Sequence, residues 1–377
     1  MRNIIVSLIL LFNVFFLFSQ GQKIIQPAVP SLMISPDARA SGLGEQGVAT
    51  SPDAFSQHWN PAKYVFLDNK SGVGVSYTPQ NTKVGVEDSF LANLNYYNII
   101  DDRSSWSTNF KFWTFGEISL TQNPQDQPYL EEPSVFSIDG SYTLKLSDFF
   151  SMAVTGRFFS SDLKYKSIDF DTGSTNSFSV DVSGFYQSDE IAYENFNGVW
   201  RAGFNISNMG PKIKYDELGT KNFIPTNLKL GSAFDFIFDS SSKLSVNLEL
   251  NKLLIPSRSV PTLDGDNNII GYSQPDVTFF SGMFKSFGDA LGGFSEEITE
   301  INLAFGLEYL YNDSFALRVG YFGEHEDQGD RKFITYGTGF TLNEINLDLS
   351  YLQTPSSSDV INPNDGTLRF SFTYNFN

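Results

Sequence analysis

The run GLGEQG at residues 42–47 matches G-x-G-x-x-G, the pattern that binds pyrophosphate in dinucleotide-binding folds. In those folds the glycines follow a buried strand and open a helix, so that the phosphates meet the helix N-terminus. Here a polar, turn-rich segment precedes the run, and Pro52 follows before one helical turn is secure. We therefore interpret the run as an irregular segment whose glycine backbone packs closely against another part of the protein.

Residue types that usually carry catalysis or bind metal ions are scarce, because the chain has no cysteine and only two histidines, His58 and His325. Neither histidine has the spacing to further ligands that would predict a metal site. His325 lies in an acidic stretch that could be interpreted as the active site of a surface enzyme such as a lipid A deacylase. A solvated loop is the simpler interpretation. The acidic spacing at 264–268 resembles a calcium loop without its glycine at the sixth position, and we interpret it as a turn. We predict no catalytic residue, no metal site and no cofactor.

Composition narrows the class of protein. The 377 residues carry a formal net charge of −18, and only 18% of them are charged. An acidic chain of this kind is not expected to bind nucleic acid, whose phosphates attract basic surfaces. The absence of cysteine excludes disulfides and a lipid-modified cysteine anchor. The aromatic content of 15% is typical of a membrane β-barrel with aromatic girdles.

The N-terminus is expected to direct the chain out of the cytoplasm. Arg2 is followed by an apolar run at residues 4–18 and by small or polar residues at 19–22. This run is too short for a transmembrane helix, which needs roughly 20 residues, and it is typical of a signal peptide. We assign residues 1–21 to the signal peptide, and we find no later stretch that is long and apolar enough for a helical span.

From residue 67 onward, apolar and polar residues alternate in segments of roughly ten residues, as in strands whose two faces meet different surroundings. The alternation is clearest in the last segment, where every second side chain is large and apolar: Leu368, Phe370, Phe372, Tyr374 and Phe376. In a soluble sandwich this face would be the core, whereas in a membrane barrel it faces lipid.

The connections between these segments favour the barrel. We place about fourteen strands, joined alternately by tight turns and by long polar connections, the longest near 255–300. The strands are expected near residues 70–79, 90–100, 104–121, 134–147, 149–160, 176–188, 197–207, 226–238, 242–254, 301–311, 314–322, 331–342, 344–353 and 366–377. Outer-membrane barrels have an even strand number, short periplasmic turns and long extracellular loops. We therefore expect residues 67–377 to form an antiparallel barrel in contact with outer-membrane lipid. The short turns should be periplasmic because the mature N-terminus would start there, and Phe376 resembles the C-terminal signal read by the barrel-insertion machinery.

Residues 22–66 precede the first strand and show no clean periodicity, yet they contain large apolar residues such as Leu32, Phe55 and Trp59. We expect this segment to fold into the barrel as a hatch, or plug, with a periplasmic arm outside the barrel as the alternative. The plug interpretation rests on small residues at positions expected to face the lumen, which leave room for a second backbone: Gly231, Ala233, Ala304, Gly306, Gly320, Gly337 and Gly339.

The longest connection contains the strongest signal for an interaction surface. Its large apolar residues have a spacing close to that of one helix face: Phe280, Met283, Phe284, Phe287, Leu291 and Phe294. Glycines at 288, 292 and 293 weaken the helical interpretation. The connection would either fold over the mouth of its own barrel or expose an apolar patch to a partner.

The segment at 38–62 resembles the N-terminal hatch of the FadL-like outer-membrane transporters. It carries Ala-Arg-Ala-Ser-Gly-Leu-Gly at 38–44 and Asn-Pro-Ala at 60–62, the hatch motif of those barrels. Within that superfamily the chain is most similar to the PorV family of the type IX secretion system. Three stretches carry this likeness, at 35–62, 286–297 and 362–371, although Leu291 stands where many relatives have a proline.

The resemblance implies a non-enzymatic role in protein secretion. Proteins of this family dock beside a giant translocon barrel of the SprA type and bind the C-terminal signal domain of type IX cargo. They then pass the cargo to a surface attachment complex containing a PorU-type sortase. The resemblance gives two sets of site residues: the hatch motif Gly42, Gly44, Asn60, Pro61 and Ala62, and a partner-binding loop with Phe284, Phe287, Asp289, Leu291 and Phe294.

The alternative is a FadL-like transporter of hydrophobic small molecules, whose plugged lumen would open to carry the substrate. The Phe-rich loop with its Asp-Ala-Leu-Gly-Gly-Phe run at 289–294 favours the secretion hypothesis.

Overall fold

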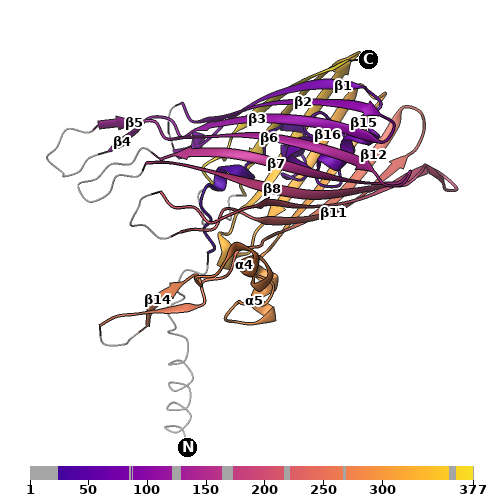
Figure 1. Ribbon diagram of the computed structural model, residues 1–377. Helices are drawn as coiled ribbons and strands as arrows, with labels where there is room; N and C mark the ends of the chain where they lie inside the picture. Colours follow the sequence, from indigo (N-terminus) through magenta and orange to yellow (C-terminus); the bar gives the residue numbers. More distant parts are fainter. Residues whose placement is uncertain are drawn as a thin grey trace, which may run out of the picture.

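The strands form one closed antiparallel barrel, as predicted from the alternation (Figure 1). The predicted signal peptide, residues 1–21, lies outside the described residues. This computed structural model describes residues 24–84, 86, 88–120, 129–163, 173–215, 221–265, 269–355 and 362–376.

Fourteen strands make up the wall of the barrel. They are β1 (Ser71–Pro79), β2 (Phe90–Asp101), β3 (Ser104–Thr114), β6 (Ser134–Lys145), β7 (Phe150–Asp162), β8 (Ser174–Gln187), β10 (Asn197–Met209), β11 (Asn227–Ile237), β12 (Ser242–Leu253), β15 (Ile301–Tyr311), β16 (Phe315–Gly323), β17 (Lys332–Leu342), β18 (Ile345–Gln353) and β19 (Leu368–Phe376). The ring closes where the first strand pairs with the last, from Ser71 opposite Phe376 to Tyr77 opposite Phe370. A closed ring leaves no edge strand unpaired, as a lipid environment requires.

Two connections differ from the sequence expectation. The strand expected at 104–121 ends at Thr114, and the apolar residues beyond Gly116 belong to a separate hairpin of β4 (Ile118–Leu120) and β5 (Tyr129–Glu131). Gly116 has a φ of 77°, a conformation that interrupts a strand. The connection at 188–196 is not a tight turn, because β9 (Ile191–Ala192) extends the sheet there.

The two faces of the wall differ as the alternation predicts. In β19, exposed side chains alternate with buried ones along the whole strand. Phe370 is 47% exposed on the outer face, whereas the neighbouring Arg369 is 1% exposed on the inner face. The apolar outer face suits lipid, and the polar inner face encloses the segment before β1.

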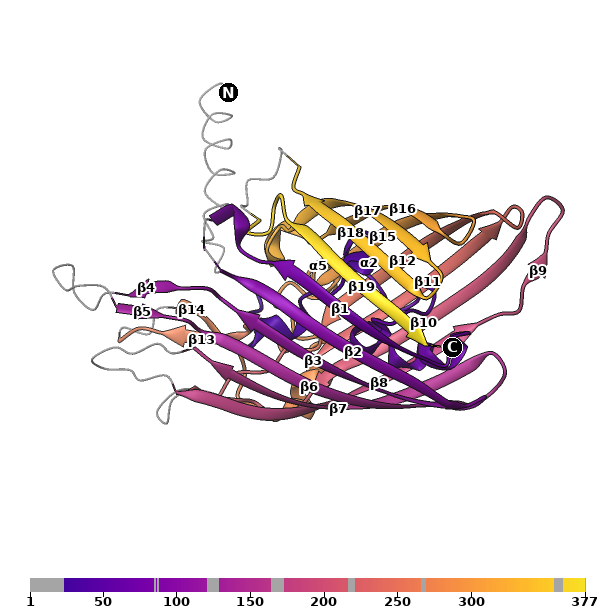
Figure 2. The same cartoon turned by 90° about the horizontal axis from the view of Figure 1, so that it is seen from above.

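That N-terminal segment lies inside the barrel and forms the plug (Figure 2). It contains four short helical pieces, η2 (Pro30–Met33), α2 (Ala38–Ser41), α3 (Ser56–Trp59) and η3 (Pro61–Phe66). The second piece packs against β17, β18 and β19, and the last packs against β6, β7 and β8. The plug therefore touches both halves of the wall.

The plug runs through the lumen from one end to the other. Its first described residues lie at the end with the long connections, where Ile25 packs with Phe223 and Ile255. Its last residues lie at the tight-turn end, where the carbonyl of Lys70 accepts a hydrogen bond from Ile99 N. The first described residues therefore lie at the end opposite to the start of β1, because the plug crosses the lumen before β1 begins.

Other helices are few and short. The longest connection carries a hairpin of β13 (Val260–Leu263) and β14 (Ile269–Ser273), then α4 (Phe279–Lys285) and α5 (Phe294–Thr299). Single turns η4 (Thr82–Val84) and η5 (Glu326–Gln328) lie in two other connections. Within the described residues, no helix has the length and hydropathy needed to span a membrane.

Candidate functional site

The first two glycines of GLGEQG, Gly42 and Gly44, pack against glycines of the wall. A Cβ on Gly42 would lie 3.0 Å from the Cα of Gly337, and a Cβ on Gly320 would overlap the backbone of Gly44. Gly44 itself has a φ of 83°, and a Cβ there would lie 2.6 Å from the carbonyl oxygen of Tyr321. The plug backbone thus touches the wall with no side chain between them, which agrees with the close approach predicted from the sequence.

The Asn-Pro-Ala motif fixes the other end of the plug to the wall. Asn60 donates through Nδ2 to the carbonyl oxygens of Val48, at 2.9 Å, and Gly184, at 3.0 Å. Its Oδ1 accepts from the Ala62 amide at 3.1 Å, which caps η3. The carbonyls of the next two residues accept from wall hydroxyls on β6 and β7: Pro61 O from Thr143 at 2.9 Å and Ala62 O from Ser151 at 2.6 Å.

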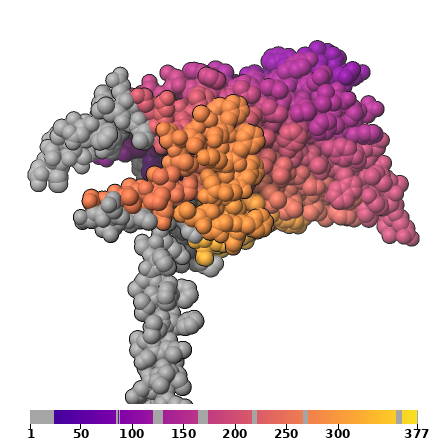
Figure 3. Space-filling view, turned by 60° about the horizontal axis from the view of Figure 1, so that its bottom comes forward, coloured from indigo at the N-terminus to yellow at the C-terminus, as the bar shows by residue number. Residues whose placement is uncertain are grey.

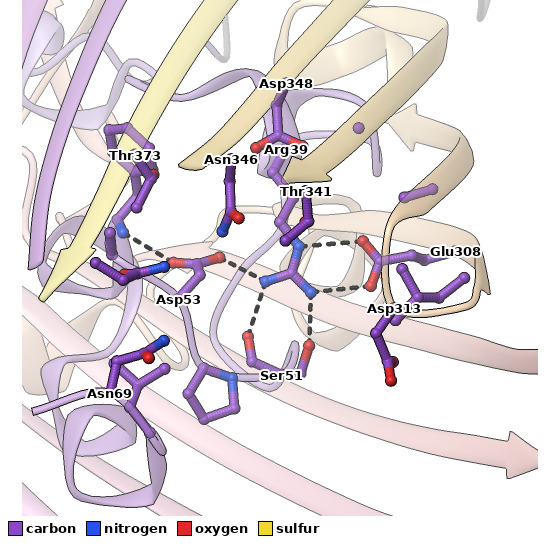
Figure 4. A pocket seen from close by; sticks show the side chains of 18 of the residues that line it. Arg39, Ser51, Asp53, Asn69, Glu308, Asp313, Thr341, Asn346, Asp348 and Thr373 are labelled. Carbon is purple, nitrogen blue, oxygen red and sulfur yellow. Dashed lines mark hydrogen bonds and ion pairs between the residues drawn. The ribbon is translucent and has the colours of Figure 1, made fainter. Parts of the chain in front are cut away.

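A buried charge network joins the plug to the wall around Arg39 (Figure 4). The guanidinium donates to both carboxylate oxygens of Glu308 on β15, at 2.9 and 3.0 Å. It also donates to Asp53 at 2.7 Å and to the hydroxyl of Ser51 at 2.6 Å. On the wall, Arg318 binds the same Glu308 at 2.5 Å, so the carboxylate is shared between two guanidinium groups. Each charge in this network has an opposite partner, which a buried position requires.

A cavity of about 220 Å³ lies beside this network, at the tight-turn end of the lumen. It is lined by Arg39, Asp53 and Glu308 together with Asn69 and Asp313 near the rim (Figure 4). Its lining mixes charged groups with apolar residues such as Phe55, Leu67 and Leu310, so it carries more charge than the largely apolar pockets that bind hydrophobic small molecules.

Two further plug residues carry charges in unusual surroundings. Burial lowers the pKa of Lys63 to about 8, and its ammonium group donates to Gly47 O at 2.9 Å and to Thr50 Oγ1 at 3.1 Å. Burial, with the nearby charge of Asp53, raises the pKa of Asp37 to about 6. The contacts of Lys63 hold two parts of the plug together.

The two histidines lie in different surroundings. His58 is buried in the plug, and its Nδ1 lies 3.2 Å from the ammonium of Lys111. Burial, together with that charge, lowers the pKa of His58 well below its usual value, which favours the neutral imidazole. His325 is partly exposed and lies 3.6 Å from Asp327. In the described part of the chain, no three His, Asp or Glu side chains are placed to hold a metal ion.

The longest connection holds the second set of expected site residues at the opposite end of the barrel. Figure 3 shows it in orange, standing out over the end of the molecule. Thr278 caps α4, and Gly282 in this helix packs directly on Phe223 and Pro256. Lys252 on β12 forms ion pairs with Glu297 at 3.1 Å and with Glu300 at 2.5 Å. The connection is therefore fixed to the wall.

Its large apolar side chains point away from this attachment. Phe284 is 71% exposed, Leu291 59% and Phe294 81%, and Phe280 and Phe287 are exposed as well. Met283 differs, because it is buried against the barrel. We call the exposed set Phe280, Phe284, Phe287, Leu291 and Phe294 the loop patch.

Asp289 is not part of the loop patch. Its carboxylate oxygens are shielded from solvent, and burial raises the pKa of Asp289. The residues with helix-like spacing do not belong to one helix, because α4 ends at Lys285 and α5 begins at Phe294, with the glycine-rich residues 288–293 between them. The patch is therefore built from two short helices and the turn between them.

The sequence analysis missed the buried charges of the wall. Arg157 on β7 donates to Asp139 at 2.7 Å and to Asp181 at 2.8 Å, and Arg201 on β10 pairs with Asp235 at 2.5 Å. The available signal was the presence of charged residues at inward positions of the alternation, where they need partners of opposite charge.

Comparison with known proteins identifies the family. The family model described as "Type IX secretion system protein PorV" matches residues 18–260. This chain belongs to the PorV family. As a PorV-family protein with a closed β-barrel, it is an outer-membrane component of the type IX secretion system. None of the curated proteins matches the chain in sequence.

Solved structures with TM-scores above 0.5 confirm the barrel fold of this PorV-family chain. The Pseudomonas putida toluene transporter TodX aligns with a TM-score of 0.51 at 12% identity, covering 90% of this chain and 98% of that one. A deltaS2 mutant of the TodX monoaromatic hydrocarbon channel gives 0.52 at 11% identity, covering 92% and 100%. A Pseudomonas aeruginosa FadL homologue gives 0.45 at 12% identity, covering 92% and 99%. Because the sequence identities are only 11–12%, the structures with TM-scores above 0.5 show a shared fold and nothing further.

Proposed function

We propose that this PorV-family barrel receives cargo proteins from a SprA-type translocon by their C-terminal signal domains and delivers them to a PorU-type attachment complex. In this role the barrel is non-enzymatic and conducts nothing, and its loops are the working surface. The observation that carries the proposal is the loop patch, which is held rigidly at the end of the barrel and left uncovered within the described chain.

The energetics of the loop patch suit a protein partner. Burying a Phe or Leu side chain against a partner stabilises a complex by roughly 1.5–3 kcal/mol. The ion pairs of Lys252 and the packing of Gly282 on Phe223 order the connection before binding, so a partner does not have to order it. A few exposed, preordered aromatic residues are typical of interaction hot spots.

The orientation that this function needs places the tight turns in the periplasm and the long connections outside. It is supported by the outer-membrane pattern of short periplasmic turns and long external loops. The chain has no cysteine, so single cysteines can report sidedness. We expect Leu263→Cys in the long connection to react with an impermeant maleimide on intact cells, and Asn312→Cys in a tight turn to react only after lysis. The reverse pattern would overturn the orientation.

The contacts between plug and wall favour the hypothesis of a sealed barrel and disfavour that of a transporter of small molecules. Plug and wall meet backbone to backbone at Gly42 and Gly44, and Arg39 ties them through Glu308. An open path would require these contacts to separate. The likeness to TodX concerns the fold, so the transporter remains the alternative outcome of the experiment below.

The deciding experiment is a crosslinked pull-down of the tagged protein from native outer membrane, followed by mass spectrometry. We expect a very large barrel protein together with exported proteins that share a C-terminal domain. Leu291→Ser is expected to reduce cargo recovery, because it removes an apolar contact from the centre of the loop patch.

Leu130→Ser is the matched control for that variant. Leu130 lies in a different long connection and is 58% exposed, against 59% for Leu291. Equal cargo recovery from Leu291→Ser and Leu130→Ser would contradict a role for the loop patch. Recovery of the barrel alone with bound fatty or aromatic small molecules would favour the transporter.

A further inference from the structure

A second surface feature lies at the long-connection end and is separate from the loop patch. It is a hollow of about 820 Å³ between the connection at 210–226 and the one at 254–277, with Gln26 of the N-terminal segment at its side. We call it the basic hollow. Its charged lining residues are Lys212, Lys221, Arg258 and Asp276.

The charge of the basic hollow is opposite to that of the whole protein. Of its described lining residues, three are cationic and one is acidic, in a chain with a net charge of −18. Asp276 pairs with Lys212 at 2.8 Å, and its side chain is fully exposed at the rim. Among the described residues, neither Lys221 nor Arg258 has an ion-pair partner within salt-bridge distance, although Lys221 lies near enough to Asp276 to help lower the pKa of that carboxyl. Unpaired cations in a concave wall concentrate anions there.

The walls of the basic hollow are held in place by the protein. An isolated β-bridge joins Ile213 to Asn222, with backbone hydrogen bonds of 2.9 and 2.7 Å. This bridge brings Lys212 over the ring of Phe223, with the ammonium 4.8 Å from the ring centroid. The opposite wall is held by Gln274, which donates to Pro256 O at 3.1 Å. The hollow is therefore formed before any ligand arrives.

Chemistry and size together define the ligand. Lys and Arg groups are the usual partners of phosphate, and Arg can bind it through two hydrogen bonds. The volume is in the range of pockets that hold a ligand of several rings, and it is far larger than a phosphate ion needs. The exposed ring of Tyr272 adds an apolar surface on which a sugar ring can pack.

We propose that the basic hollow binds a phosphorylated sugar through Lys212, Lys221 and Arg258, a function beyond cargo handling. Two sources offer this chemistry: the phosphorylated sugar headgroup of an outer-leaflet glycolipid, and a soluble sugar phosphate. The glycolipid source rests on the orientation proposed above, whereas the soluble source does not.

The test measures binding by native mass spectrometry of the full protein in a neutral detergent, with lipid A and glucose 1-phosphate as probes and polyglutamate as a non-phosphate anion. The pocket variant is Lys221→Glu with Arg258→Glu. We expect it to weaken binding of the phosphorylated probe by about tenfold or more, because two charges that attract an anionic headgroup are replaced by two that repel it. The control is Lys70→Glu with Lys285→Glu, which makes the same charge change at exposed lysines outside the hollow.

The outcomes separate the sources. The glycolipid source is supported if the pocket variant, but not the control, loses binding of lipid A. The soluble source is supported if the pocket variant, but not the control, loses binding of glucose 1-phosphate and lipid A is not bound. The proposal would be overturned if both variants lost binding equally or if neither lost it. It would also be overturned if the protein preferred polyglutamate or bound none of the probes. The heat-dependent migration of folded barrels in SDS gels confirms that each variant is folded. Cargo recovery in the pull-down reports on secretion independently.

Discussion

The backbone of Gly44 in the plug lies directly against Gly320 on β16, so closely that a side chain on Gly320 would overlap it. The Gly44 amide also donates to the hydroxyl of Thr335 on β17, at 2.9 Å. Three segments that are far apart in the sequence thus meet at one point. The fit between plug and wall at this point depends on the absence of two side chains.

Gly320→Ala is expected to loosen the plug and destabilise the barrel by about 1–3 kcal/mol, because the new Cβ meets backbone that cannot move aside cheaply. Urea unfolding followed by tryptophan fluorescence measures the stability, and limited trypsin digestion measures exposure of the plug. The control is Gly140→Ala, since a Cβ there would meet no atom within 4 Å. Equal unfolding midpoints for the two variants would contradict the close packing.

Arg39→Ala removes the cation that plug and wall share, and it leaves Asp53 and Glu308 with fewer partners. Breaking a buried ion pair costs about 3–5 kcal/mol. The loss for this variant should lie at the lower end of that range, because Arg318 still pairs with Glu308. Lys83→Ala breaks the ion pair with Asp365, in which the lysine is 57% exposed, and should cost less than about 1 kcal/mol. Urea unfolding of both variants tests the difference, and a similar loss would show that the Arg39 network contributes little.

Asn60→Asp is expected to be at least as damaging as Asn60→Ala. The Nδ2 group of Asn60 donates to two carbonyl oxygens. In the aspartate variant a carboxylate oxygen would replace this donor, and it would repel the same two oxygens in a buried site. Each unsatisfied buried group costs about 1–3 kcal/mol, and more when it is charged. The amount of folded protein in the outer membrane, measured by its heat-dependent gel migration, gives the comparison. Wild-type levels of Asn60→Asp would show that the Asn-Pro-Ala motif is not an anchor.

Lys63 should make stability depend on pH in the alkaline range. Its pKa in the folded protein is about 8, against an ordinary value of 10.5, because burial disfavours the charged form. Between these values the unfolded chain holds more protons than the folded one, so stability rises with pH through that window, by up to about 3 kcal/mol. Lys63→Met is expected to remove this rise. Parallel pH curves of unfolding free energy for the two proteins would contradict the shift.

The sequence predicted the wall well, because alternation is a local property of each strand. The strand expected at 301–311 has those same bounds, and the one expected at 242–254 ends at Leu253. The failure at 104–121 has a local cause as well, since the apolar residues beyond Gly116 continue the alternation in a different hairpin. Alternation alone does not show where one hairpin stops and the next begins.

The candidate site was only partly predictable. Glycines at lumen positions predicted close packing, and the structure pairs Gly42 with Gly337 at the expected place. The partners of Arg39 were not predictable, because Glu308 belongs to a distant strand and the pairing depends on how the plug sits in the ring. In the long connection, composition predicted an exposed apolar surface but could not separate the exposed Phe284 from the buried Met283.

The plug places a condition on the order in which the barrel is made. The segment from Ile25 to Lys70 enters at one end of the ring and leaves at the other, and bulky buried residues such as Trp59 and Tyr64 fill the space between. A finished ring that admits no side chain between Gly44 and Gly320 cannot have such a segment drawn through it afterwards. The sheet must therefore curl around its own N-terminal segment, and the pairing of β1 with β19 is the step that encloses it.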